Sequence, residues 1–121
     1  CKIEEKTYYE RFGDFPIMHV VAIRQELVER EPWIARATID MFNHARDLAE
    51  SYYEDPNWSR MARGRHAYEE ERNFFDGDPW CNGFQKNRAN IERFIKYSHD
   101  QGLIDAAYEP EALFVEDTLD T

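Results

Sequence analysis

The chain has 121 residues, of which 33% are charged, and its formal net charge is −10. No apolar run approaches the ~20 residues that cross a bilayer, so a membrane span is not expected. The 15 Lys and Arg residues are scattered among 25 Asp and Glu residues, which makes nucleic acid and anionic membranes unexpected partners. A chain of this length forms a single domain or part of one.

The first two predicted elements are a short helix and a strand. Apolar residues at near-helical spacing predict a helix within residues 1–14, which Gly13 ends. Residues 15–24 contain a run of four apolar residues and are predicted to be a buried strand of a parallel sheet, with Pro16 tolerated at its start. His19 is placed at the mouth of this strand and can titrate near neutral pH.

The remainder of the chain is predicted to be mostly helical. The strongest pattern is an amphipathic helix over residues 32–53, whose broad apolar face is expected to cover the sheet. Its apolar stripe follows 4-3-4-3-4 spacing through Ile34, Thr38, Met41, Ala45, Leu48 and Tyr52. The segments after it are one or two short helices in 58–75, a turn-rich loop over 75–83, a helix over 84–101 capped by Gly102, a short helix over 110–114 and an acidic tail over 116–121 that is expected to fray.

The predicted fold class is α/β, but one strand cannot make a sheet. Either further strands lie in the first dozen residues, or the chain lacks a partner segment. We favour the second interpretation, in which residues 1–121 form a single partial domain.

The sequence contains no Gly-rich phosphate loop, HExxH, CxxC or GxSxG motif. His19 could donate a proton or bind a carboxylate, although spacing alone favours a histidine bonded to nearby backbone. Arg24 could clamp a substrate carboxylate, although pairing with Glu26 or Glu29 is favoured.

The remaining polar candidates have plain structural interpretations. His44, His66 and His99 are predicted to be surface residues, and none has a convincing metal-ligand spacing. Asp76 and Asp78 are expected to cap a helix or accept backbone N–H bonds rather than bind a cation. Cys1 and Cys81 are too few for a disulfide framework and fit a reducing compartment, and a single disulfide between them is the alternative. No metal site is predicted, and no cofactor is indicated.

Several short motifs follow one another along the sequence. The most specific are Gly13-x-Phe15-Pro16-Ile17-Met18-His19 and Tyr97-Ser98-x-x-Gln101-Gly102-Leu103. Between and after them come Val21-x-Ile23-Arg24, Pro32-Trp33-Ile34-Ala35, Asp78-Pro79-Trp80 and Pro110-Glu111-x-Leu113-Phe114. In this order and at this spacing, the motifs resemble those of the 4,5-dihydroxyphthalate decarboxylase family. The chain departs from the family pattern at Cys81-Asn82, where a proline and a tyrosine are usual, and at Asp14, where an apolar residue is usual.

This resemblance implies a fold and an activity. The fold is the type 2 periplasmic-binding-protein-like arrangement of two α/β lobes, of which the chain would be the C-terminal part, without the N-terminal lobe. The activity is non-oxidative decarboxylation of 4,5-dihydroxyphthalate to protocatechuate in aromatic catabolism. By the same resemblance residues 13–19 lie near the hinge and cleft, so His19 is expected to be catalytic and Asp14, Met18 and Arg24 to bind an aromatic carboxylate.

Two other functions compete with this enzyme. A solute-binding protein of an ABC-type transporter would capture a small organic anion on the same fold, in the periplasm rather than in the cytoplasm. An isolated lobe without activity would show an exposed apolar patch or self-associate.

Overall fold

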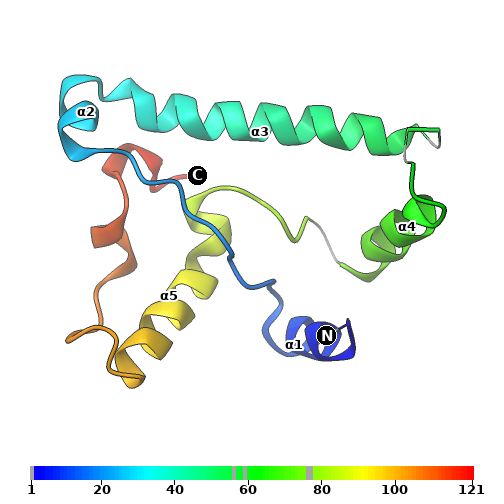
Figure 1. Ribbon diagram of the computed structural model, residues 1–121. Helices are drawn as coiled ribbons and strands as arrows, with labels where there is room; N and C mark the ends of the chain where they lie inside the picture. Colours follow the sequence, from blue (N-terminus) through cyan, green and yellow to red (C-terminus); the bar gives the residue numbers. More distant parts are fainter. Residues whose placement is uncertain (1, 56, 59, 76–77) are drawn as a thin grey trace.

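The computed structural model describes residues 2–55, 57–58, 60–75 and 78–121, and in these ranges the regular structure is entirely helical (Figure 1). The α-helices are α1 (Lys2–Phe12), α2 (Gln25–Arg30), α3 (Trp33–Glu54), α4 (Gly64–Phe74) and α5 (Phe84–Asp100). Two 3-10 helices, η1 (Pro110–Leu113) and η2 (Glu116–Thr118), follow them.

The predicted strand at 15–24 is wrong, and with it the α/β class and the two-lobed fold. Residues 15–24 form an irregular connection from α1 to α2 (Figure 1), and the structure has no strand in the described ranges. Val20 and Val21 are 72% and 60% exposed instead of buried. The apolar run favours a strand only where a second strand can take its backbone hydrogen bonds, and the described residues provide none.

The predicted helices and their ends are largely confirmed. The first helix ends at Phe12, and Gly13 follows with a φ of +73°. The helix predicted over 32–53 is α3, and the one predicted over 84–101 is α5, followed by Gly102 with a φ of +70°. These positive φ values are the left-handed conformation that glycine adopts at helix ends without steric cost.

Two expectations about packing are wrong. The apolar face of α3 covers no sheet within the described residues, and Met41, Leu48 and Tyr52 on that face are exposed. The acidic tail does not fray into solvent, because η2 forms there and Thr118 is buried, its hydroxyl donating to the Val115 carbonyl. Asp120 binds Arg36 of α3 at 2.5 Å, which ties the tail to that helix.

The core is small and lies between α5 and the C-terminal segment. Phe84, Ile91 and Ile95 are buried together, and Ile104, Phe114 and Leu119 pack against them. The chain exposes 9657 Å², whereas a compact monomer of 14.5 kDa exposes about 6,900 Å². Much apolar surface is therefore left uncovered by the described chain.

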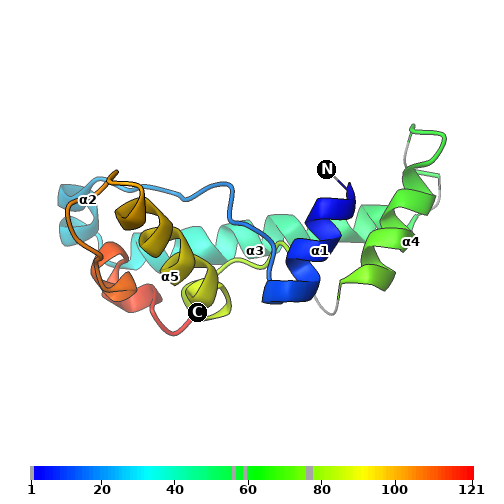
Figure 2. The ribbon, with the colours of Figure 1, turned by 90° about the horizontal axis from the view of Figure 1, so that it is seen from below.

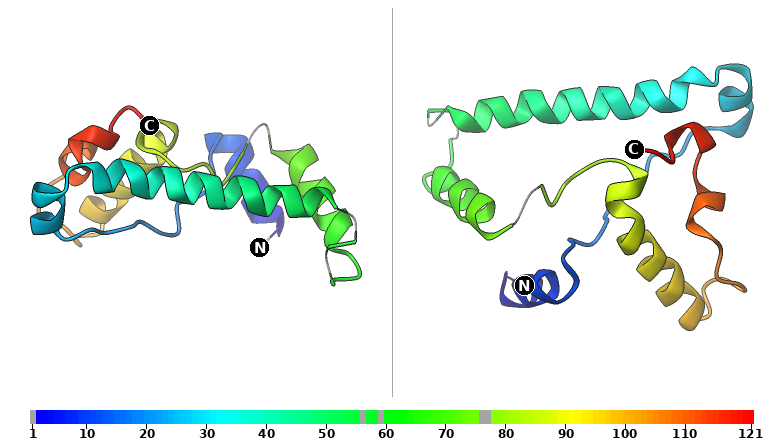
Figure 3. Two further views of the ribbon diagram at one scale, coloured as in Figure 1. Left: turned by 90° about the horizontal axis from the view of Figure 1, so that it is seen from above. Right: turned by 180° about the vertical axis from the view of Figure 1, so that it is seen from behind.

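The helices form an open frame rather than a closed bundle. Seen from below, α3 runs behind α5 and α1, with α2 near one end and α4 at the other (Figure 2). Seen from behind, the same long helix borders one side of the molecule, and seen from above it runs across the front of the other helices (Figure 3). None of the described helices is both long and apolar enough to cross a membrane.

Candidate functional site

The turn after α1 is fixed by two polar side chains of α5. Both carboxylate oxygens of Asp14 accept hydrogen bonds from Arg93 Nη1, at 2.8 and 2.9 Å. One turn earlier on α5, the amide of Asn90 donates to the backbone carbonyl of Phe15. Because residues three apart share one face of a helix, α5 holds two successive residues of this turn and directs the chain that follows.

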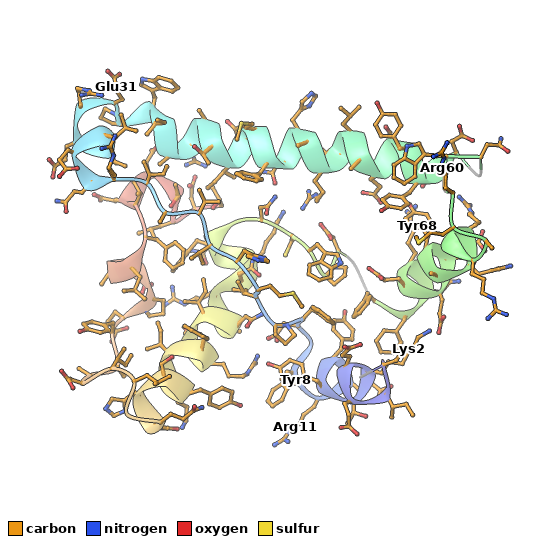
Figure 4. All side chains as sticks on the ribbon, in the orientation of Figure 1. Lys2, Tyr8, Arg11, Glu31, Arg60 and Tyr68 are labelled. Carbon is orange, nitrogen blue, oxygen red and sulfur yellow. The ribbon has the colours of Figure 1, made fainter. Side chains whose placement is uncertain are left out.

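Arg93 is the centre of this arrangement. Its side chain is 17% exposed, and it also donates to the Tyr8 hydroxyl at 3.1 Å and lies over the Phe12 ring at 4.3 Å. Tyr8 is on the side of α1 that faces α5 (Figure 4). Burial by itself lowers the pKa of Arg93, but the hydrogen bonds with Asp14 and Tyr8 outweigh it and raise that pKa above the usual value.

A cavity of about 190 Å³ opens between α1 and α4. The rings that line it come from Phe15, Phe74, Phe75 and Trp80, and its other lining residues are Lys2, Glu5, Lys6, Ala67, Glu70 and Glu71. Phe15 connects the cavity to the fixed turn, since its ring meets Phe75 edge-on at 5.8 Å and Trp80 at 5.0 Å.

The charged groups of this cavity are largely paired with one another. Lys2 bonds Glu70 at 2.6 Å on the α4 side of α1 (Figure 4), and Lys6 lies 3.6 Å from the same carboxylate. The hydrogen bond from Lys2 holds the pKa of Glu70 below its usual value. The Trp80 indole N–H donates to Glu71 at 3.1 Å. Because both lysines are already bound to a carboxylate, this cavity is a poor receptor for a dianion.

The residues predicted to form the site are not gathered into one pocket. The Asp14 carboxylate is paired with Arg93, whereas Met18, His19 and Arg24 are exposed on the connection between α1 and α2. The side chains of His19 and Arg24 form no ion pair with the described residues, so the predicted pairing of Arg24 with Glu26 or Glu29 is absent there.

Of the other candidates, the three remaining histidines and Asp78 have the surroundings that their structural interpretations predicted. His44, His66 and His99 are exposed. The Asp78 carboxylate accepts the backbone N–H of Trp80 at 2.9 Å and lies 2.7 Å from Arg46 Nη1. Asp76 and Cys1 fall outside the described residues, and Cys81 is a free thiol. The described ranges contain no group of three or more His, Cys, Asp or Glu residues placed to hold a metal ion.

Sequence reasoning missed Arg93 and Asn90. Asn90 and Phe15 are 75 positions apart, and Arg93 and Asp14 are 79 positions apart. No local pattern separates Arg93 from the other arginines of the chain. The one available signal was Asp14 itself, a charged residue where the family pattern has an apolar one.

The comparisons with known proteins give one distant relationship. No family model matches the chain. It is 29% identical over 109 residues to a protein of Comamonas testosteroni named 4,5-dihydroxyphthalate decarboxylase, a match that covers 88% of this chain and 33% of that protein. The chain therefore spans about a third of the length of this curated relative.

Proposed function

We propose that this chain is part of a carboxy-lyase that removes a carboxylate from a dihydroxylated aromatic dicarboxylate, converting 4,5-dihydroxyphthalate to protocatechuate. The observation that carries the proposal is the match to the Comamonas protein of that name along 88% of the chain. The relative is three times longer than the matched region, so the activity is proposed for the full-length protein and not for these residues alone.

The reaction needs a proton donor and no oxidant. The bond between the ring carbon and the carboxylate breaks, its electron pair stays on the ring carbon, a proton takes the vacated position and CO2 leaves. His19 is the residue we assign to this proton transfer, because imidazole can donate near neutral pH and its side chain is exposed without a partner in the described chain.

Substrate contacts are assigned to Met18 and Arg24. The Met18 side chain is 64% exposed, so its thioether can contact an aromatic ring. The Arg24 guanidinium can pair with a carboxylate. Asp14, bound to Arg93, would position this segment from its first residue.

The test is turnover of 4,5-dihydroxyphthalate by the full-length protein, with CO2 and protocatechuate measured together. We expect His19→Ala to lower turnover at least ~100-fold, the lower range for a general acid. His66→Ala is the matched control, since His66 is also exposed but lies on α4, and it should leave turnover unchanged.

Two outcomes of the turnover assay would contradict the proposal. An unchanged rate in His19→Ala would remove His19 from the chemistry. Tight binding of the diacid by the wild-type protein without CO2 release would overturn the enzyme and favour a protein that captures organic anions.

A further inference from the structure

The segment that carries His19 is held at its two ends. At its start, the side-chain amide of Asn90, a residue only 6% exposed, donates to the backbone carbonyl of Phe15. At its other end, the Arg24 carbonyl accepts two backbone N–H groups from the first turns of α2, at 3.0 and 3.2 Å. Between them, residues 16–23 form no hydrogen bond within the described ranges. The path of this segment therefore depends on how its ends are fixed.

Asn90 holds the main chain, whereas Arg93 holds a side chain. The Asp14 carboxylate that Arg93 binds is joined to the backbone through rotatable bonds, so this pair leaves the direction of the following residues partly free. The Phe15 carbonyl belongs to the backbone itself, four residues before His19. The hydrogen bond from Asn90 therefore fixes the direction in which the segment leaves α5.

Asparagine is an unfavourable residue for its own helix at this position. It lies in the interior of α5, where alanine or leucine would be preferred because the asparagine amide competes for backbone hydrogen bonds. Burying the amide is also unfavourable unless a hydrogen bond compensates for the lost water. The bond to the Phe15 carbonyl supplies that compensation. Asn90 is therefore explained by the segment that it holds and not by the needs of α5.

We propose that Asn90 is a positioning residue for His19. It is buried on α5, so it acts on the reaction through the segment that it holds. This inference rests on the proposed function, in which His19 supplies the proton. Because a displacement of about 1 Å between reacting groups can lower a rate on the order of 100-fold, the loss of this one hydrogen bond slows the proton transfer without removing the donor.

The experiment compares two asparagines of α5 in the full-length protein. Asn87 is the matched control, because its amide also donates to backbone carbonyls, those of Cys81 and Gly83 at 2.8 and 2.9 Å, which lie outside the His19 segment. We expect Asn90→Leu, which keeps the volume but cannot donate, to lower kcat for 4,5-dihydroxyphthalate at least ~10-fold. The change in KM should be smaller, because a proton donor acts in the chemical step. Asn87→Leu should leave kcat unchanged.

A double substitution separates positioning from general damage to the fold. Because Asn90 acts through His19, Asn90→Leu should lower kcat no further in a protein that already carries His19→Ala. An equal loss with and without His19 would overturn the inference. So would a wild-type kcat in Asn90→Leu, or equal losses in Asn90→Leu and Asn87→Leu.

A second measurement needs no turnover and uses the smaller variants Asn90→Ala and Asn87→Ala, in case the leucine variants fold poorly. Thermolysin cuts before large apolar residues, and several of these lie within residues 16–23. We expect cleavage there to be at least ~3-fold faster in Asn90→Ala than in Asn87→Ala, because one hydrogen bond no longer opposes opening of the segment. Equal cleavage would overturn the inference. A wild-type protein that releases no CO2 would instead overturn the proposed reaction, with Asn90 still shown as the anchor if cleavage differs.

Discussion

The bond between Asp14 and Arg93 is the contact that fixes the start of the segment carrying His19. We predict that it contributes about 1.5 kcal/mol of coupling to the free energy of unfolding. Exposed ion pairs contribute ~0.2–1 kcal/mol, while removing one partner of a fully buried pair costs ~3–5 kcal/mol. The side chains of Arg93 and Asp14 are 17% and 20% exposed, which places this pair between the two limits.

The assay is a double-mutant cycle of Asp14→Asn, Arg93→Met and the double variant, followed by urea unfolding. The methionine keeps most of the apolar stem of Arg93 on the Phe12 ring, so the cycle reports mainly on the charge and its hydrogen bonds. The control is Lys96 with Asp100, an ion pair on the same helix whose side chains are 67% and 50% exposed.

The control pair should couple clearly more weakly than Asp14 and Arg93, as exposed helical pairs do. Coupling below ~0.5 kcal/mol for Asp14 and Arg93 would refute the reasoning, because it would mean that water screens both pairs alike. The turn would then be held by Asn90 and by ring packing alone.

Three further predictions concern the small core and its edges. Phe84→Ala should destabilise the fold by about 3–5 kcal/mol, because Phe84 is 2% exposed. Phe94→Ala, at a position 70% exposed on the same helix, should lower the stability by less than ~1 kcal/mol, and thermal unfolding compares the two variants. Gly83→Ala should cost ~1–3 kcal/mol, since its φ is +115° and a Cβ would come 2.7 Å from the backbone of the last residue; an unchanged melting temperature would contradict this. The hydrogen bond from Arg88 lowers the pKa of Glu111 below 4.5, so the stability that this bond adds is present above about pH 4.5 and is lost as the pH falls through the lowered pKa. The difference in unfolding free energy between wild type and Glu111→Gln should therefore shrink over that range. A difference that stays constant with pH would be inconsistent with the lowered pKa.

Local signals in the sequence predicted the helices well. Gly13 and Gly102 marked helix ends because only glycine adopts a positive φ there without cost. The period of α3 was correct because helix periodicity depends on residues three and four apart. The Asp78 turn was predicted for the same reason, since its carboxylate accepts an N–H two residues on.

The errors arose where apolar character was equated with burial inside this chain. The run from Val20 to Ile23 and the stripe of α3 were both expected to pack against a sheet, and most of their side chains are exposed. Hydrophobic pattern shows that a surface favours a partner, but not whether the partner lies in the same chain. The Asp14–Arg93 pair was unpredictable for a different reason, because it joins residues 79 positions apart without a local motif.

The most direct test of the proposed chemistry is the reaction carried out in D2O. The full-length protein is incubated with 4,5-dihydroxyphthalate, and the product is examined by proton NMR and mass spectrometry. The proposal predicts protocatechuate with one deuterium on the carbon that lost its carboxylate, formed at least ~100-fold more slowly by His19→Ala. Recovery of unchanged diacid after prolonged incubation with the wild-type protein would contradict it.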